Sequence, residues 1–280
     1  MASRLFWGLL LGLVFLFVTL QSQPWVLLAF GVVHLVSQLE FMTLAGGQAP
    51  AGRIAHAVLT TLLWLLLSLT LTGGLPGVWL LVAVAVLIVA CASAAVATGL
   101  HARLRLSSES HYAVWSVLLI TLPLACVPLL LDSTDGGPLY LLLIGASWGA
   151  DSGAIFAGKL LGRTQLSPQL SPKKTVEGVV GGALAAGLIW SGAALLYPAA
   201  AARLSAGIAG EQWQLLAAMC AVGAGLSIVG LFGDLTFSLF KRQAGAKDYG
   251  AVIPGHGGML DRFDSLAFVA PVLLAAAMVW

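Results

Sequence analysis

Residues 76–99 read PGVWLLVAVAVLIVACASAAVATG, a stretch without one Asp, Glu, Lys or Arg. A helix needs about 20 mostly apolar residues to cross the hydrocarbon core of a bilayer, so this stretch is long enough to span a membrane. Eight further runs are similarly apolar, and glycine and proline interrupt the chain between them. The nine predicted spans are residues 5–20, 24–44, 54–72, 76–99, 111–131, 137–158, 178–200, 211–240 and 264–280.

The composition of the whole chain supports this interpretation. Of its 280 residues, 60% are hydrophobic and 9% are charged, whereas a soluble domain carries about 25% charge. In water such a chain would expose large apolar patches. This excludes soluble enzymes, disordered chains and nucleic-acid binders. We predict an all-α, polytopic integral membrane protein with about nine transmembrane helices.

The basic residues predict how the chain is oriented in the membrane. Alternate loops between the nine spans share a side, and one side holds all but one of the 13 Lys and Arg residues. The exception is Arg203. Because cytoplasmic loops carry the excess of Lys and Arg, we predict that the N-terminus and the basic loops are cytoplasmic.

Near residue 145 the chain changes character. Residues 1–140 hold about five spans with few polar groups, whereas acidic and basic residues gather in residues 141–280. The second region includes two predicted cytoplasmic loops, 159–177 and 241–263. We therefore expect an N-terminal transmembrane region and a catalytic transmembrane region, with the active site at the cytoplasmic side.

Three polar residues within predicted spans need an explanation, because an ionised group at membrane depth costs at least about 2.5–3.5 kcal/mol. Asp151 lies among small residues, where helix backbones can approach closely. It is either a structural carboxylate paired with a lysine or part of a polar site facing a cavity open to the cytoplasm. For His34 and Glu40, an interhelical hydrogen bond is the favoured interpretation.

The loop 159–177 reads KLLGRTQLSPQLSPKKTVE. Its two Ser-Pro pairs favour extended backbone, because a residue before proline avoids the α region. Lys173 and Lys174 come just before the next helix, for which Thr175 is a suitable N-cap. The two lysines are predicted either to touch anionic lipid headgroups or to bind phosphate oxygens together with the N–H groups of the helix end.

The end of the long eighth span and the segment after it combine acidic and basic residues. On a helix, Asp234, Ser238, Lys241 and Arg242 follow the spacing i, i+4, i+7, i+8 and form one polar stripe. Residues 254–258 form a glycine-rich turn whose backbone could approach a phosphate closely. Carboxylates here would hold a divalent cation that bridges phosphates. The alternative is that these charges only pair with one another.

Two motifs resemble the CDP-diacylglycerol synthases, also called phosphatidate cytidylyltransferases. The first reads Ala150-Asp151-Ser-Gly-Ala-Ile-Phe-x-Gly158-Lys159-x-x-Gly162-Arg163, followed by Ser171-Pro172-Lys173-Lys174-Thr175-x-Glu177-Gly178. The second reads Ser238-x-x-Lys241-Arg242-x4-Lys247-Asp248-x5-Pro254-x-His256-Gly257-Gly258-x-x-Asp261-Arg262-x-Asp264. The departures from the family pattern are Ile155, Arg163 and Val176.

The resemblance implies the transfer of a cytidylyl group from CTP to phosphatidate in phospholipid biosynthesis, giving CDP-diacylglycerol and pyrophosphate. It implies Mg²⁺ as the cofactor, with a monovalent cation such as K⁺ as a candidate second ion. The expected setting is the inner (cell) membrane of a bacterium, with CTP, phosphatidate and the bilayer as partners. A homodimer is the candidate assembly, and no nucleic acid is expected.

The resemblance and the residue chemistry together define the predicted site. Asp234 and Asp261 are the predicted metal ligands, with Asp264 supporting them. The predicted catalytic residues are Asp234, Asp261, Asp264, Lys241 and Arg242. The predicted substrate-binding residues are Asp151, Lys159, Ser171, Lys173, Lys174, Ser238, Lys247, His256 and Arg262.

Two other functions stay open at this point. One is a CTP-dependent transferase that acts on another lipid phosphate or on a lipid alcohol. The other is a transporter of a phosphorylated metabolite, which would also place charge within the membrane. Transporters commonly show inverted repeats, and none is visible in this sequence.

Overall fold

The computed structural model of the chain describes residues 23–44, 50–71, 109–133, 135–204, 211–255 and 257–279, with the isolated residues 17, 46, 84 and 88. The predicted spans 5–20 and 76–99 lie outside these ranges, as does His256. The described elements are α2 (Gln23–Leu44), α3 (Pro50–Leu71), α5 (Glu109–Ser116), η2 (Val117–Thr121), α6 (Leu122–Asp132), α7 (Gly136–Ile144), η3 (Gly145–Gly149), α8 (Ala150–Leu161), β1 (Gln165–Ser167), β2 (Ser171–Thr175), α9 (Val176–Leu196), α10 (Pro198–Leu204), α11 (Gln212–Gln243) and α12 (Leu260–Val279).

Within the described residues, six helical segments are long and apolar enough to cross a membrane. They are Pro24–Leu44, Pro50–Leu71, Tyr112–Asp132, Gly136–Leu161, Val176–Leu196 and Gln212–Gln243. Two of these segments contain a short π-helical turn, η2 or η3, without a break in the helix. The chain is therefore an all-α, polytopic membrane protein, as the sequence predicts.

The two predicted loops are shorter than expected, and one of them contains strands. Residues 165–175 form a two-stranded antiparallel hairpin, β1–β2, in place of an extended loop. Helix α9 begins after Thr175, whose side chain accepts a hydrogen bond from Gly178 N at 3.1 Å, so the predicted N-cap is confirmed. Helix α11 continues through Lys241 and Arg242, because cations stabilise a helix C-terminus. It ends before Gly245, whose φ of 69° suits glycine.

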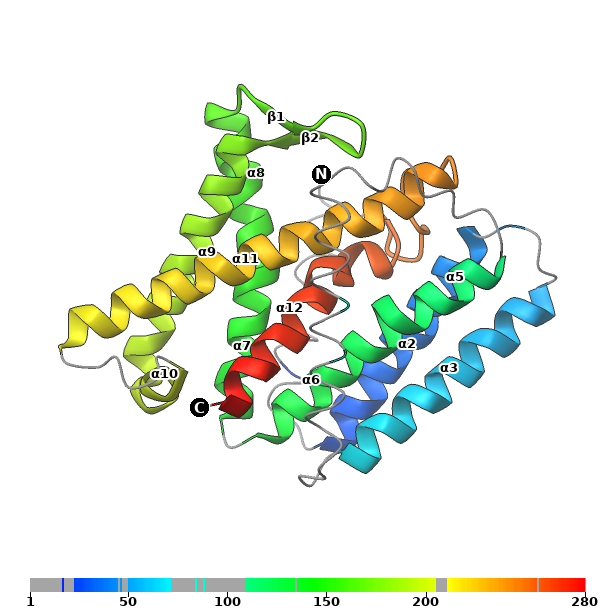
Figure 1. Ribbon diagram of the computed structural model, residues 1–280, viewed down its shortest axis with the longest axis horizontal. Helices are drawn as coiled ribbons and strands as arrows, with labels where there is room; N and C mark the ends of the chain where they lie inside the picture. Colours follow the sequence, from blue (N-terminus) through cyan, green and yellow to red (C-terminus); the bar gives the residue numbers. More distant parts are fainter. Residues whose placement is uncertain are drawn as a thin grey trace.

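Figure 1 shows two groups of helices with α12 between them. Helices α2, α3 and α5–α6 lie side by side in one group, and α8, α9 and α11 pack together in the other. Helix α12 contacts α11 on one side and α6 on the other. The hairpin projects from the end of α8, on the side where α11 ends and α12 begins.

Small residues allow α8 and α9 to pack closely. A Cβ atom added to Gly182 would lie 2.8 Å from Ala150 O, and one added to Gly178 would lie 3.0 Å from Ala154 O. Such short distances leave no room for a larger side chain. The backbones of the two helices therefore approach one another along this seam, which forms one wall of the site described below.

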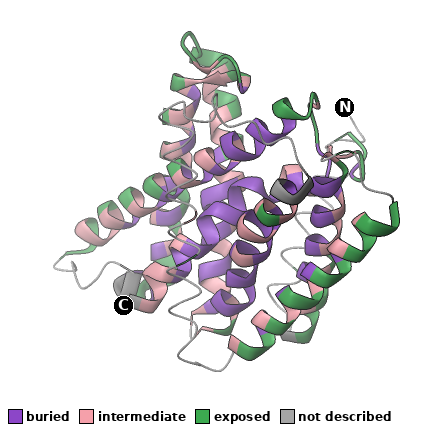
Figure 2. Cartoon of the chain, turned by 45° about the vertical axis from the view of Figure 1, so that its right-hand side comes forward, coloured by how far each residue is buried: buried purple, intermediate pink, exposed green. Residues whose placement is uncertain are grey.

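One hydrophobic core joins both predicted regions. Phe30 of α2 packs edge to face on Phe263 of α12, with 6.2 Å between the ring centroids. Buried residues concentrate on the central helices, whereas outer faces are exposed (Figure 2). Several of these outer faces are apolar, for example Leu66 on α3 and Leu188 on α9. Lipid is the expected environment for such faces.

Candidate functional site

A cavity of about 610 Å³ lies between α8, α9, α11, the β1–β2 hairpin and the start of α12. Part of its wall consists of small residues, including Ala150, Ala154, Gly182 and Gly230. Among the residues that the structure describes, five acidic and five basic side chains also line it. They are Asp151, Asp234, Asp248, Asp261, Asp264, Lys159, Lys173, Lys174, Lys241 and Arg262.

The cavity brings together most of the predicted site residues. Those that line it are Asp151, Lys159, Ser171, Lys173, Lys174, Asp234, Lys241, Asp261, Arg262 and Asp264. Of the predicted residues with a described position, three lie outside its lining: Ser238, Arg242 and Lys247. Residues more than a hundred positions apart in the sequence thus converge because α8, α9, α11 and α12 meet here.

Lys174 on β2 forms an ion pair with Asp234 on α11. The Ser238 hydroxyl lies one turn further along α11 and donates to Asp234 Oδ1 at 3.4 Å. Burial acts to lower the pKa of Lys174, but the charges of Asp234 and Asp151 outweigh burial and raise it. Lys174 therefore stays charged. Asp151 also lines the cavity, and its charge interacts with that of Lys174.

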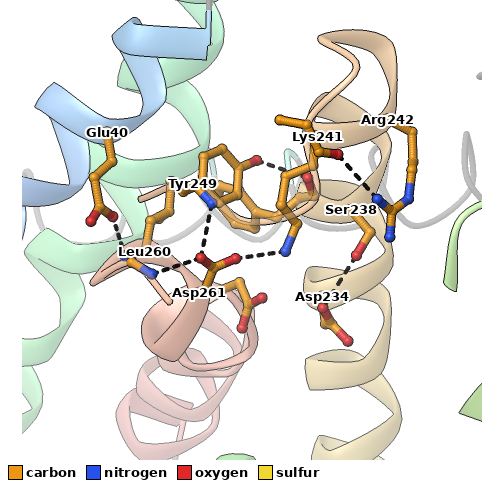
Figure 3. Close-up of polar contacts among 12 residues, drawn as sticks. Glu40, Asp234, Ser238, Lys241, Arg242, Tyr249, Leu260 and Asp261 are labelled. Atoms are coloured by element: carbon orange, nitrogen blue, oxygen red, sulfur yellow. Dashed lines mark hydrogen bonds and ion pairs between the residues drawn. The ribbon is translucent and has the colours of Figure 1, made fainter. Parts of the chain in front are cut away.

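Asp261 holds the loop between α11 and α12 in place (Figure 3). Its Oδ1 atom accepts a hydrogen bond from Lys241 Nζ at 2.7 Å, in an ion pair that is almost fully buried. Its Oδ2 atom accepts hydrogen bonds from Tyr249 N and Gly258 N, each at 2.9 Å. Both carboxylate oxygens thus bind the chain itself, and the loop closes around them.

Tyr249 is a buried residue of the same loop, and its side chain attaches the loop to α11. Its hydroxyl donates to Phe237 O at 2.8 Å, and Lys241 Nζ lies 5.2 Å from the centroid of its ring. Burial and the nearby Asp261 raise the pKa of Tyr249 well above its ordinary value. The phenol therefore stays protonated and keeps its role as a donor.

Asp234 and Asp264 place two carboxyl groups in the cavity wall. The two groups interact electrostatically, and Asp264 accepts a hydrogen bond from Ser265 N at 2.7 Å. Two adjacent carboxylates repel unless a proton or a cation lies between them. No group of three His, Cys, Asp or Glu side chains within the described ranges is arranged to hold a metal ion. Mg²⁺, however, is commonly bound by one or two carboxylates plus substrate phosphates.

Two side chains fix the hairpin that carries Lys173 and Lys174. Arg242 donates from Nε to Leu170 O at 3.1 Å, and Leu170 packs against Leu235 and Leu239 of α11. At the other end, Glu177 accepts hydrogen bonds from the backbone N–H groups of Arg163 and Thr164. Arg242, one of the predicted catalytic residues, lies outside the cavity lining and binds the hairpin.

Glu40 is a contributor that sequence reasoning missed. Its carboxylate accepts hydrogen bonds from Met259 N at 2.9 Å and from Leu260 N at 2.8 Å, at the start of α12. A Cβ atom added to Gly250 or Gly258 would lie 2.6 Å from a Glu40 carboxylate oxygen. An acidic residue within an apolar span indicates that its side chain has a polar partner. The sequence pattern does not indicate that this partner lies more than 200 residues away. His34, in contrast, makes the interhelical hydrogen bonds predicted for it.

Comparisons with known proteins agree with these motifs. The model of the cytidylyltransferase family matches residues 2–280. A phosphatidate cytidylyltransferase of Synechocystis sp. is 46% identical over 138 residues, which cover 48% of this chain and 41% of that protein. One of Staphylococcus aureus is 42% identical over 135 residues (48% and 46%), and one of Rickettsia bellii is 34% identical over 166 residues (59% and 69%). In two of these three relatives, the match spans less than half of the protein's length. The chain belongs to the cytidylyltransferase family.

Proposed function

We propose that this chain transfers a cytidylyl group from CTP to phosphatidate and releases pyrophosphate. The observation that carries this proposal is the cavity itself. Its small apolar wall lies between membrane-spanning helices, and its charged part lies where the hairpin meets α11 and α12. Such a cavity suits a lipid with a phosphate head and a soluble triphosphate that meet at the membrane boundary. The names of the three relatives support the same reaction.

The reaction needs positioning more than covalent chemistry. A phosphate oxygen of phosphatidate attacks the α-phosphorus of CTP, and the bond to the β-phosphate breaks as pyrophosphate leaves. Lys173, Lys174 and Arg262 line the cavity and would bind phosphate oxygens. Lys174 would exchange its partner Asp234 for a phosphate when substrate enters. Lys241, already paired with Asp261, would add positive charge at the cavity wall.

The balance of charge in the cavity favours a metal ion. Five basic side chains face five acidic ones, so the protein alone offers no excess positive charge to a triphosphate. Asp234 and Asp264 would hold Mg²⁺, because their two carboxylates repel each other and a cation bound between them would remove this repulsion. Bound there, the ion would offset the charge on the transferred phosphate. Asp261, the other predicted ligand, already accepts three hydrogen bonds from the chain, and K⁺ stays a candidate second ion.

We also propose that the cavity faces the cytoplasm of a bacterial cell, in a nine-span arrangement of the inner membrane. The excess of Lys and Arg in the loops of this side supports that orientation. In a variant without Cys91, Cys126 and Cys220, a cysteine at Gln169 should react with an impermeant reagent only in inside-out vesicles. A cysteine at Ser133 should react only from the opposite side. Labelling of both cysteines from one side would contradict this topology.

The predicted homodimer is a separate proposal. Light scattering in detergent would measure whether the chain forms it.

The reaction is tested by mixing the purified full chain with Mg²⁺, CTP and phosphatidate in mixed micelles and measuring pyrophosphate. We expect release that requires all three additions. Higher activity with another lipid phosphate, or with a lipid alcohol, would favour the alternative transferase instead. Absence of turnover, combined with uptake of a phosphorylated solute into proteoliposomes, would favour the transporter.

A further inference from the structure

Ser147 has a hydroxyl group that lacks the usual partner of a helical serine. The residue lies in the π-helical turn η3 and lines the cavity, and only 1% of its surface is exposed. Its Oγ atom makes no hydrogen bond with any residue that the structure describes. Buried polar groups in folded proteins are nearly always hydrogen-bonded, so an orphan in a cavity wall indicates a missing partner. π-Helical turns are also frequent at functional sites.

Two other serines in the cavity wall have hydroxyl groups that donate hydrogen bonds. Ser227 on α11 donates to Ala224 O at 2.8 Å, the bond that a helical serine makes to its own backbone. Ser265 on α12 donates to Asp264 Oδ1 at 3.3 Å. Ser147 makes neither kind of bond, so its buried hydroxyl lacks a partner at the edge of the cavity.

The depth of Ser147 indicates which part of a ligand it would meet. It lies four residues before Asp151 on the same continuous helix, which places it about 6 Å further from the hairpin end. The lining residues next to it on the same helix, Ala146 and Ala150, are small and uncharged. A phosphate would stay with the charges at the level of Lys174. The next part of a phosphatidate molecule toward its acyl chains is the glycerol, with its two ester carbonyl oxygens.

A second orphan donor lies close by. Arg262 lines the cavity, and its Nε atom is buried without a hydrogen-bond partner in the described part of the chain. Trp148, the residue after Ser147, donates from Nε1 to Arg262 O at 2.9 Å, which fixes the crossing of η3 and α12. Both residues therefore line the same cavity, from adjoining elements. A ligand with a phosphate and an ester group a few bonds apart could satisfy both.

We propose that the Ser147 hydroxyl donates a hydrogen bond to an ester carbonyl oxygen of the lipid substrate, and so selects ester-linked over ether-linked phosphatidates. This rests on the proposed function, because it assigns one contact within the same site. An ether oxygen is a much weaker acceptor than an ester carbonyl. A diether lipid would leave the buried hydroxyl unpaired, and binding sites reject analogues that leave their buried polar groups unpaired.

The test compares dioleoyl phosphatidate with its dialkyl ether analogue of matched chain length. Pyrophosphate release is measured for the wild type, for Ser147→Ala and for Ser227→Ala. In the wild type we expect kcat/KM to be about tenfold higher for the diester, the effect of one hydrogen bond to a buried group. Ser147→Ala should lower kcat/KM for the diester by about tenfold, leave that for the diether unchanged, and leave KM for CTP unchanged. Ser227→Ala removes a satisfied hydroxyl from the same wall and should keep the wild-type ratio.

The outcomes separate this inference from the proposed function. Equal activity of the wild type on both lipids would overturn the role of Ser147, whatever the variants do. So would a Ser147→Ala enzyme that keeps the wild-type preference, because its hydroxyl would then serve only an ordered water. Absence of pyrophosphate release from CTP with either lipid would overturn the proposed function, and this inference with it.

Discussion

The N-terminal helices and the cavity region both bury polar side chains, but they satisfy them differently. In the N-terminal group, His34 of α2 bonds through Nδ1 to Thr61 Oγ1 at 3.0 Å and through Nε2 to Thr121 Oγ1 at 3.1 Å. Its ring stacks on Trp64, with 5.6 Å between the centroids. Around the cavity, in contrast, Lys174 pairs with Asp234 and Lys241 with Asp261, beside open space.

This difference indicates which polar groups serve packing and which serve a ligand. Side chains such as His34 and Thr121 are fully buried and have partners on neighbouring helices, so they fix how α2, α3 and η2 pack. The charged groups of the cavity can exchange one partner for another, because a phosphate or a cation can replace an opposite charge. Glu40 is the exception, since it belongs to the N-terminal group and binds the loop of the cavity region.

The largest effect should follow Asp234→Asn. Asparagine keeps the shape and can still accept from Ser238, but it removes the charge that Lys174 and a metal ion need. We expect pyrophosphate release to fall at least about 100-fold, as when one strong transition-state contact is lost. Where activity remains measurable, the Mg²⁺ concentration for half-maximal rate should rise. Asp248→Asn is the control, because Asp248 is exposed. Wild-type kinetics of Asp234→Asn would remove the metal from this site.

Asp261→Asn should differ from Asp234→Asn in stability. Asp261 accepts three hydrogen bonds and pairs with Lys241, and the side chains in this pair are only 5% and 8% exposed. Breaking a buried ion pair by removing one partner costs about 3–5 kcal/mol. We therefore expect Asp261→Asn to lower both activity and Tm by a clear margin, whereas Asp234→Asn keeps a Tm close to wild type. Equal Tm values for the two variants would contradict the structural role of Asp261.

Lys174→Ala should have the next largest effect, because Lys174 is paired inside the cavity. Loss of a charged hydrogen bond is worth about 1.5–3 kcal/mol, so kcat/KM should fall at least about tenfold. Lys173→Ala is the matched control one residue away. Lys173 is exposed on the hairpin, and its effect should be smaller and should weaken with added salt. A larger loss for Lys173→Ala would reverse the assignment of the two lysines.

The sequence predicted most of the residues that line the cavity, but not the residues that hold the hairpin and the start of α12 in place. The two motifs that carry the family resemblance contain most of the carboxylates and lysines that line the cavity, so these residues could be named from the sequence. It did not predict that Arg242 would bind Leu170 O or that Glu40 would bind the start of α12. Both bonds join segments far apart in the chain, one of them 220 residues apart, and periodicity says nothing about such pairs. Ser147 lies in a π-helical turn, which no propensity indicates.

Glu40→Gln tests the one residue that crosses between the two regions. Glutamine offers one acceptor oxygen where two N–H donors, from Met259 and Leu260, now bind. We expect kcat/KM to fall about fivefold, mostly in kcat, because the loop that carries Asp261 loses part of its support. Faster hydrogen exchange at the Met259 and Leu260 amides should accompany the loss. Unchanged exchange together with unchanged kcat would show that Glu40 does not position the loop.

The smallest kinetic effect should follow Thr121→Val, which tests the N-terminal network alone. Valine is nearly isosteric with threonine but lacks the hydroxyl that contacts His34 Nε2 and Gln38 Nε2, at 3.1 and 3.0 Å. Leaving these buried groups unpaired costs about 1–3 kcal/mol, so Tm should fall by several degrees. Because no cavity residue depends on this hydroxyl within the described structure, kcat/KM at a temperature well below Tm should stay within about twofold of wild type. A kinetic loss as large as that of Glu40→Gln, with little change in Tm, would show that the N-terminal network also shapes the site.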